Sequence, residues 1–316
     1  MPTNVGKPKP SKQTLAAHLS LIAVTFVWGT TFPLVKAALR DVSPLLFNFL
    51  RMVLAASILA TLNWRTLRGL TRAQMRLCGL AGILLALGYE VQTVGLTQTT
   101  PSKSAFLTGL VVVFVPLLSA LPGVRQPQTP RPHGFAYAGA FLAFAGLILL
   151  TSEPGAGLSL LSGLHLGEWL TLGCAVAFAF HLLTLARAAG SVPPRVLGTL
   201  QIAFAALAML LFLPLEKHQV LRLNPLVCIA FGVTSILATA AAFTIQSWAQ
   251  QHLPASHTAL IFTLEPVFAW LTSLIFFGER LGSRALGGAT LILGGIVLAE
   301  LGPTALSQTA VLPMEP

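Results

Sequence analysis

Glu265 stands beside Pro266 near the middle of an apolar run that extends from Thr258 to Phe277. The run has the ~20 residues that a helix needs to cross hydrocarbon, where a charged side chain costs at least ~2.5–3.5 kcal/mol. Pro266 has no N–H group, so the carbonyl of Phe262 loses its helical partner and the helix is expected to bend. An acidic residue beside a bend is typical of a transport pathway, and also of a kinked helix whose acid only hydrogen-bonds the freed backbone.

The Glu265 carboxyl group needs compensation, because no lysine or arginine lies at its depth. Desolvation favours the protonated form of a carboxyl group. The alternatives are an ion pair with a cationic substrate or with His181 in the sixth apolar run. Proton-coupled transport needs an acid that exchanges a proton with each side of the membrane in turn. Glu265 is the first candidate for that role and Glu90 the second.

Arg51 and Glu90 form a second cluster of costly side chains. At ~1.5 Å per residue, each lies about 10 Å below the same membrane surface, too deep to remain unpaired. We therefore expect an ion pair, which either locks the second and third helices together or orients the charged end of a substrate near the mouth of a cavity. The counterparts of these residues in the second half of the chain, Gln201 and Thr244, are neutral.

Trp28 and Phe32 form an aromatic face in the first apolar run, close to Gly29 and Pro33, which loosen a helix. Trp28 lies roughly 13 Å into its helix, about as deep as Glu265, although tryptophan usually prefers the membrane interface. We expect these rings to line a cavity and contact the apolar part of a substrate; packing in the core or against lipid is the alternative. A set of inward-facing polar side chains would orient a ligand there, although hydrogen bonding between helices explains any one of them. The set comprises Asn48, Tyr89, Gln92, Thr108, His181, Gln201 and Gln246.

The composition is that of an integral membrane protein. Of the 316 residues, 55% are apolar and only 9% are charged, and the mean hydropathy is +0.80. A soluble domain has roughly 25% charged residues. Ten apolar runs predict ten transmembrane helices, and the short linkers between them leave no room for a soluble catalytic or nucleotide-binding domain. The predicted helices are Leu15–Leu39, Pro44–Asn63, Gln74–Thr97, Lys103–Leu121, Gly134–Thr151, Leu166–Arg187, Pro193–Leu213, Pro225–Gln250, Ser256–Phe277 and Gly282–Leu301.

The net charge of +10 is explained by membrane topology and not by nucleic acid, because the basic residues flank the apolar runs and form no basic face. With the N-terminus in the cytoplasm, eleven lysines and arginines lie inside and seven outside, which favours cytoplasmic N- and C-termini. The lipid bilayer is therefore an expected partner. The cysteines are isolated in apolar runs, so we expect neither a metal site nor a cofactor. They are Cys78, Cys174 and Cys228.

The two halves of the chain resemble each other at an offset of about 150 residues, and each half has five apolar runs. Because five is odd, the second half must cross the membrane in the opposite sense, as in transporters whose substrate site lies between inverted repeats. In the fourth and ninth runs Pro116 aligns with Pro266, so Val115 is the apolar counterpart of Glu265. The expected organisation is a tail at 1–14, a first repeat at 15–151, a linker at 152–165, a second repeat at 166–301 and a tail at 302–316. Other aligned pairs are Tyr89 with Phe243, Gln92 with Gln246, Gly139 with Gly288 and Gly146 with Gly295.

Several short motifs occur in a fixed order between His18 and Leu301, and together they resemble the EamA-like permeases of the drug/metabolite transporter superfamily. The resemblance implies ten helices in two inverted five-helix repeats, and export of small metabolites, often amino acids, across the bacterial cytoplasmic (inner) membrane. The motifs are Trp28 to Phe32 with Lys36, Ser43 to Arg51, Thr99 to Pro116, Leu264-Glu265-Pro266 and Gly278 to Leu281.

The sequence thus predicts an all-α integral membrane protein that exports small neutral or zwitterionic metabolites, above all amino acids, by alternating access, with the proton as candidate coupling ion. An exporter of cationic drugs or quaternary ammonium compounds is the alternative, since Glu265, Glu90 and the aromatic faces suit a cation. A non-transporting membrane scaffold is a third interpretation, but it needs no polar residues at the midplane of several helices. An enzyme is not expected, because Asp41 is the only aspartate and no pair of intramembrane aspartates can form. The oligomeric state stays open.

Overall fold

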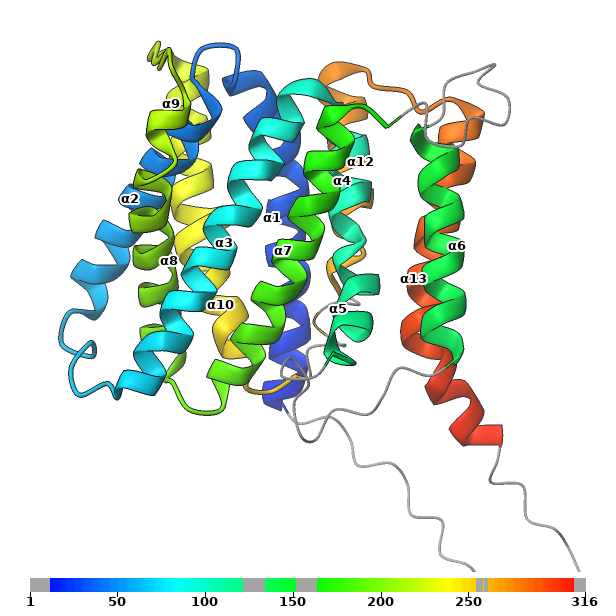
Figure 1. Cartoon of the computed structure of the whole chain (residues 1–316), viewed down its shortest axis with the longest axis horizontal. Coiled ribbons are helices and arrows are strands. Elements are labelled where there is room, and N and C mark those ends of the chain that lie inside the picture. Colours follow the sequence, from blue (N-terminus) through cyan, green and yellow to red (C-terminus); the bar gives the residue numbers. More distant parts are fainter. Residues whose placement is uncertain (1–11, 122–133, 152–163, 254–257, 259–260, 310–316) are drawn as a thin grey trace, which may run out of the picture.

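The described part of the chain is a bundle of helices with ten membrane spans, as the sequence predicts (Figure 1). The computed structural model describes residues 12–121, 134–151, 164–253, 258 and 261–309. Seven helices are long and apolar enough to cross a membrane, and three shorter apolar helices, at Tyr137–Leu150, Glu265–Phe277 and Ser283–Leu298, complete the ten. The ten-helix fold class is therefore confirmed.

Two spans are built from more than one helix. The fourth consists of α4 and α5, and the eighth of α9, the π-helical segment η2 and α10. The elements are α1 (Lys12–Ala38), α2 (Pro44–Asn63), α3 (Arg72–Gln98), α4 (Pro101–Gly109), α5 (Val111–Ser119), α6 (Gly134–Thr151), α7 (Leu166–Ala189), α8 (Pro194–Leu210), the short 3-10 helix η1 (Leu213–Leu215), α9 (Pro225–Gly232), η2 (Val233–Ala241), α10 (Ala242–Ala249), α12 (Glu265–Phe277) and α13 (Ser283–Thr309).

Local signals in the sequence set most helix ends. Proline occupies the first turn of α2, α4, α8 and α9, where its missing N–H has no helical partner to lose. Thr71 begins α3 with a capping box: its hydroxyl accepts from the Gln74 amide at 3.2 Å, and the Gln74 side chain accepts from the Thr71 amide at 2.9 Å. Gly278 ends α12 with a φ of 64°, a left-handed conformation that glycine adopts without strain. At the C-terminus α13 continues to Thr309, past the predicted end at Leu301.

The packing of the helices follows the inverted repeat. α3 packs along α7. The counterparts of these two helices in the other repeats, which are the eighth span for α3 and α1 for α7, also pack along each other. α1 also packs along α12, as α7 packs along α4 and α5, while α2 meets its own counterpart α8. The counterparts α6 and α13 run side by side at one edge of the bundle (Figure 1). They approach so closely that a Cβ atom at Gly288 would lie 2.4 Å from the Leu150 amide nitrogen.

The fourth and ninth spans are both broken, the ninth at the bend predicted beside Pro266 and the fourth away from its proline. In the fourth span the break is at Leu110, and Pro116 lies inside α5. In the ninth span the chain turns at Leu264, so Glu265 begins α12 with Pro266 in its first turn. The predicted bend is therefore a full break, since a proline in the first turn of a new helix gives up no hydrogen bond.

Aligning the two breaks changes the counterpart of Glu265. Leu110 then corresponds to Leu264, and Val111, not Val115, corresponds to Glu265. The predicted alignment on the prolines was wrong in this detail, because the break and not the proline is the shared feature. Pro266 also contacts the partner break directly: a Cβ atom at Gly109 would lie 3.4 Å from the Pro266 ring.

Candidate substrate cavity

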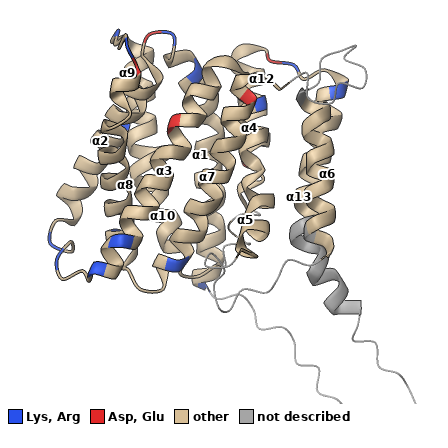
Figure 2. Cartoon of the chain, in the orientation of Figure 1, with Lys and Arg blue, Asp and Glu red and all other residues tan. Residues whose placement is uncertain are grey.

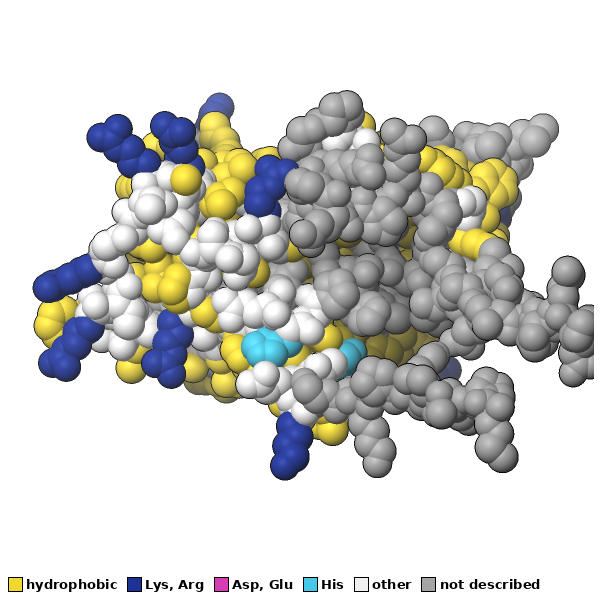
Figure 3. Space-filling model, turned by 90° about the horizontal axis from the view of Figure 1, so that it is seen from below, with side chains coloured by type: hydrophobic (Ala, Val, Ile, Leu, Met, Phe, Trp, Pro, Cys, Tyr) yellow, Lys and Arg dark blue, Asp and Glu magenta, His cyan; other side chains and the backbone are white. Residues whose placement is uncertain are grey.

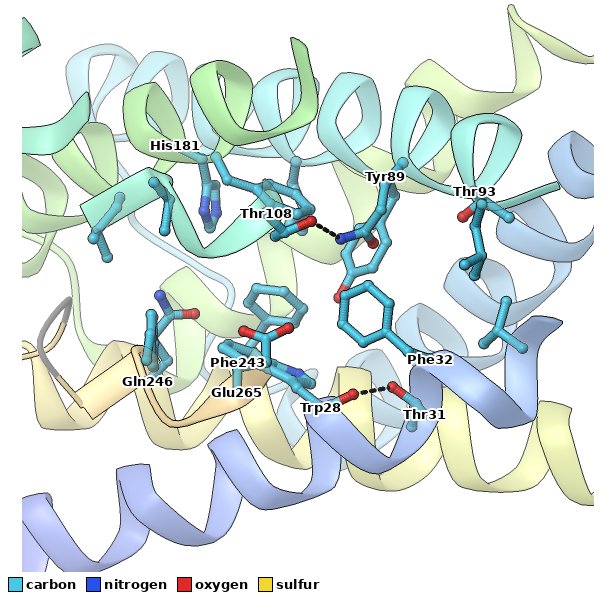
Figure 4. A pocket seen from close by; sticks show the side chains of 18 of the residues that line it. Trp28, Thr31, Phe32, Tyr89, Thr93, Thr108, His181, Phe243, Gln246 and Glu265 are labelled. Carbon is cyan, nitrogen blue, oxygen red and sulfur yellow. Dashed lines mark hydrogen bonds between the residues drawn. The ribbon is translucent and has the colours of Figure 1, made fainter. Parts of the chain in front are cut away.

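A central cavity of about 80 Å³ lies between the two repeats. Its wall comes from α1, α2, α3, α4, α5, α7, α10, α12 and Phe262 just before α12. Figure 4 shows side chains from these elements pointing toward one another around it. Of the side chains predicted to line a cavity, the structure places on this wall Trp28, Phe32, Tyr89, Gln92, Thr108, His181, Gln246 and Glu265.

Asn48 and Gln201 do not line the cavity, although the sequence predicts them there. Both are fully buried behind its wall. The Asn48 amide nitrogen donates to the Tyr89 carbonyl at 3.0 Å and to Glu90 Oε2 at 2.9 Å, while its oxygen accepts from Thr93 at 3.1 Å. Both amides thus hold helices together, which is the alternative that the sequence left open.

Glu265 projects its carboxylate into the cavity from the first turn of α12 (Figure 4). Within the described residues it has no hydrogen bond and no cationic partner. The structure joins neither His181 nor the backbone beside Pro266 to this carboxylate. Its position at a helix N-terminus offers partial compensation, because the exposed amide groups there carry a partial positive charge. The break in the ninth span therefore places an acid without a counter-ion at the centre of the bundle.

Aromatic rings surround this acid. Trp28 lies 5.4 Å from Phe243 and 5.1 Å from Phe262 between ring centroids. The Trp28 indole N–H donates to the carbonyl of Ala238 at 2.8 Å, which fixes the ring in the bundle and excludes a lipid-facing position. Phe243, which the site prediction omitted, is the repeat counterpart of Tyr89 and could have been found from the alignment.

Arg51 reaches the cavity from α2 and is held by two groups. Its Nε and a terminal nitrogen donate to the Thr239 hydroxyl at 3.3 and 2.9 Å, and the guanidinium carbon lies 4.3 Å from the centroid of the Tyr89 ring. Thr239 belongs to η2, where the wide π-helical turn changes which side chains and carbonyls face the bundle interior. Only 3% of Arg51 is exposed, so its charge is almost wholly taken from water.

The predicted ion pair between Arg51 and Glu90 is absent. Asn48 binds one oxygen of Glu90, and the other oxygen, Oε1, is buried without a hydrogen-bond partner among the described residues. Glu90 instead borders a second pocket of about 460 Å³ between α2, α3, α7 and η1, which Glu216 also lines. Partial burial raises the pKa of Glu216 above its ordinary value. The two expected partners lie at a similar depth but face different pockets, and the prediction rested on depth alone.

Further polar side chains lie on the cavity wall. The Gln92 amide donates to the Thr108 hydroxyl at 3.1 Å, joining α3 to α4 across the cavity (Figure 4). His181 enters from α7, with its Nε2 atom 2.8 Å from Gln201 Oε1. In the described part of the chain no group of three or more His, Cys, Asp or Glu side chains is placed to hold a metal ion.

The sequence pattern of the EamA-like transporter family matches residues 15–152 and 165–301, almost the whole chain. The chain belongs to this family. An uncharacterized transporter of Archaeoglobus fulgidus is 31% identical over 91% of the chain and 86% of its own length. The uncharacterized transporter YwfM of Bacillus subtilis is 23% identical over 90% of the chain and 94% of its own. This EamA-like protein is therefore a multi-pass membrane transporter.

A solved crystal structure shares the fold of this EamA-like transporter. It superposes with a TM-score of 0.66 over 92% of this chain and 99% of the other, at 20% sequence identity. At that identity the likeness extends to the fold alone. The breaks, the π-helical segment and the cavity residues must therefore be interpreted from this chain.

Proposed function

We propose that this transporter exports small zwitterionic metabolites, above all amino acids, by alternating access. The observation that carries the proposal is one cavity lined by an acidic residue, Glu265, a basic residue, Arg51, and aromatic rings. Glu265, which lacks a cationic partner, would bind the α-ammonium group, and Arg51 would bind the α-carboxylate through the planar donor face that guanidinium offers. The apolar part of the substrate would lie against Trp28 and Phe243.

Export of cationic compounds is the second candidate, and the environment of Glu265 supports it. A carboxylate beside Trp28, Phe243 and Phe262 suits a quaternary ammonium group, which aromatic faces attract. Arg51 argues against it, because a buried guanidinium on the same wall repels a cation. The two candidates therefore differ in whether the substrate carries a carboxylate.

Transport by the purified protein in liposomes tests this choice. We expect saturable counterflow of radiolabelled small amino acids and none of tetraethylammonium. Empty liposomes and liposomes with the Glu265→Gln, Arg51→Gln double variant serve as controls. Saturable transport of tetraethylammonium without transport of any amino acid would overturn the proposal in favour of the cationic candidate.

We also propose that the protein resides in the bacterial inner membrane with both termini in the cytoplasm. Figure 2 shows basic residues at both ends of the bundle. Among the side chains that the structure describes, Asp41, Glu168, Glu216 and Glu279 lie at the end away from the α2–α3 and α7–α8 connections. The opposite end, seen in Figure 3, shows lysine and arginine side chains around the described atoms and no acidic side chain. An uncompensated basic end supports a cytoplasmic position.

A further inference from the structure

A chain of buried polar side chains runs from α10 through α8 to the cavity. The Gln201 amide nitrogen lies 3.2 Å from the Ser247 hydroxyl, and the Gln201 oxygen lies 2.8 Å from His181 Nε2. Gln201 and Ser247 are fully buried, and His181 is 3% exposed. Three helices thus contribute one residue each to a continuous hydrogen-bond chain that ends at the cavity wall.

The direction of these hydrogen bonds is fixed at the Ser247 end. The Ser247 hydroxyl donates its single hydrogen to the Phe243 carbonyl at 2.7 Å, so it can only accept from Gln201. The amide nitrogen of Gln201 must therefore face Ser247, and its oxygen must face His181. An amide oxygen accepts but cannot donate, so the hydrogen between them belongs to His181 Nε2.

The other ring nitrogen of His181 then carries a free lone pair when the ring is neutral. Nδ1 has no hydrogen-bond partner among the described residues, and it is not among the polar atoms that the protein encloses. His181 lines the central cavity, so we take the unpartnered Nδ1 to face that space (Figure 4). The chain from Ser247 thus presents a hydrogen-bond acceptor to whatever occupies the cavity.

We propose that His181 Nδ1 accepts a hydrogen bond from the side-chain hydroxyl of a substrate, so that the transporter prefers hydroxyl-bearing amino acids to their apolar isosteres. The inference rests on the proposed function, in which Glu265 and Arg51 bind the two backbone charges of the amino acid. His181 is then the third anchor. Gln201 and Ser247 are positioning residues, since they act only by holding the His181 ring in place with its proton on Nε2.

The substrate preference is tested with serine and 2-aminobutyrate, which differ by a hydroxyl in place of a methyl group. A site that hydrogen-bonds a hydroxyl rejects the analogue without it, because its own polar group is left unpaired. We expect a KM for counterflow about tenfold lower for serine, as one such hydrogen bond allows. His181→Phe should bring the two KM values together without raising that of 2-aminobutyrate, whereas His252→Phe, a histidine outside the cavity, should change neither.

The positioning role is tested at Gln201. Gln201→Leu removes the acceptor that holds the His181 ring through Nε2–H, so Nδ1 is no longer held toward the substrate hydroxyl and the serine preference should fall. Gln201→Glu, measured at a pH at which its carboxyl group is protonated, keeps both an acceptor for His181 and a donor for Ser247, so the preference should persist. Equal loss in both variants, with normal transport of 2-aminobutyrate, would contradict the role assigned to Gln201.

The tautomer itself can be measured in the wild-type protein. Imidazole ¹⁵N labelling, with a His181→Gln sample to identify the resonance, should show a protonated Nε2 and an unprotonated Nδ1 that shifts when serine is added. A protonated Nδ1 in the neutral ring, or no shift with serine, overturns the inference. If no amino acid is transported at all, the proposed function is wrong, and the substrate preference that rests on it is wrong as well. Transport with equal KM values for serine and 2-aminobutyrate defeats this inference alone.

Discussion

We propose that Glu265 and Arg51 bind the two charges of the substrate, because both line the cavity and neither has a direct ionic partner among the described residues. Glu265 has only the N-terminus of α12 near it, and Arg51 has the neutral Thr239 and Tyr89. Burying a charge is costly unless something compensates it. Under the proposed function, a zwitterionic substrate brings both missing charges and lowers both costs at once.

We predict that Glu265→Gln abolishes transport driven by a pH gradient while counterflow continues at a higher KM. Glutamine keeps the size of the side chain but cannot exchange a proton between the two sides of the membrane. Proteoliposomes with and without an imposed pH gradient distinguish the two modes. Glu90→Gln is the matched control, because Glu90 lies outside the central cavity and its bond from Asn48 can be kept. An unchanged pH profile in Glu265→Gln means that this residue does not couple transport to protons.

Arg51→Lys should raise the KM for amino acids about tenfold or more. Lysine keeps the charge but loses the planar fork that binds a carboxylate with two hydrogen bonds and stacks on Tyr89. Thr239→Val keeps the guanidinium but removes the hydroxyl that receives both of its hydrogen bonds, so we expect a smaller rise. Counterflow kinetics measure the KM of both variants. A normal KM in Arg51→Lys would show that Arg51 serves the structure and not the substrate carboxylate.

For single residues, the sequence predicted well how deep a side chain lies in the membrane, but poorly which neighbours it faces. A costly side chain at the midplane must face the interior, which is why Glu265, Trp28 and His181 could be placed on a cavity. Depth cannot say which face of a helix a side chain occupies relative to its neighbours. Arg51 and Glu90 therefore share a depth without forming a pair, and the role of Gln201 behind His181 could not be predicted.

At the scale of helices, the boundaries were predictable where the chain carries local signals. Pro44 and Asn63 bound α2 as predicted, and Gly134 and Thr151 bound α6. The π-helical turn η2 has no such signal, since Val233–Ala241 contains neither proline nor glycine. The carbonyl of Ala238 in that turn accepts from the Trp28 indole, and Thr239 accepts from Arg51, so the sequence gave no sign of an element that holds two cavity residues in place.

The contact between α1 and α12 predicts a large effect at Gly29. A Cβ atom there would lie 2.6 Å from Phe268 Cβ and 2.8 Å from the Glu265 carbonyl oxygen, and neither atom is at the end of a flexible side chain. Overpacking of this kind costs about 1–3 kcal/mol. We expect Gly29→Ala to lower the thermal unfolding midpoint in detergent and to impair transport by displacing Glu265.

Gly173 supplies the control for Gly29. It also lies within a long helix, α7, but a Cβ atom there would meet nothing within 4 Å. Alanine is a better helix former than glycine by roughly 1 kcal/mol, so Gly173→Ala should leave the unfolding midpoint unchanged or raise it. Equal behaviour of the two variants would mean that α1 and α12 do not pack as closely as the structure shows.

At the scale of the whole molecule, the inverted repeat was predictable from an odd number of spans and is reproduced by the packing of the helices. The two repeats nevertheless contribute unequal chemistry. The first supplies Arg51 and the second supplies Glu265, whose counterpart Val111 is apolar although it lines the same cavity. The shared fold thus provides a broken helix in each repeat, while each of the two charged residues of the cavity is found in one repeat only.

The orientation of this asymmetric site in the membrane is the last prediction. We expect that, in whole bacterial cells lacking the outer-membrane barrier, a membrane-impermeant maleimide labels Gln219→Cys, between η1 and α9, and not Thr66→Cys, between α2 and α3. Both positions are exposed and uncharged, so the substitutions leave the charge bias intact. A Cys228→Ser background removes the exposed native thiol, and permeabilised cells should show both labels. The reverse labelling pattern would place the basic end of the bundle outside the cell and would contradict the proposed cytoplasmic position of both termini.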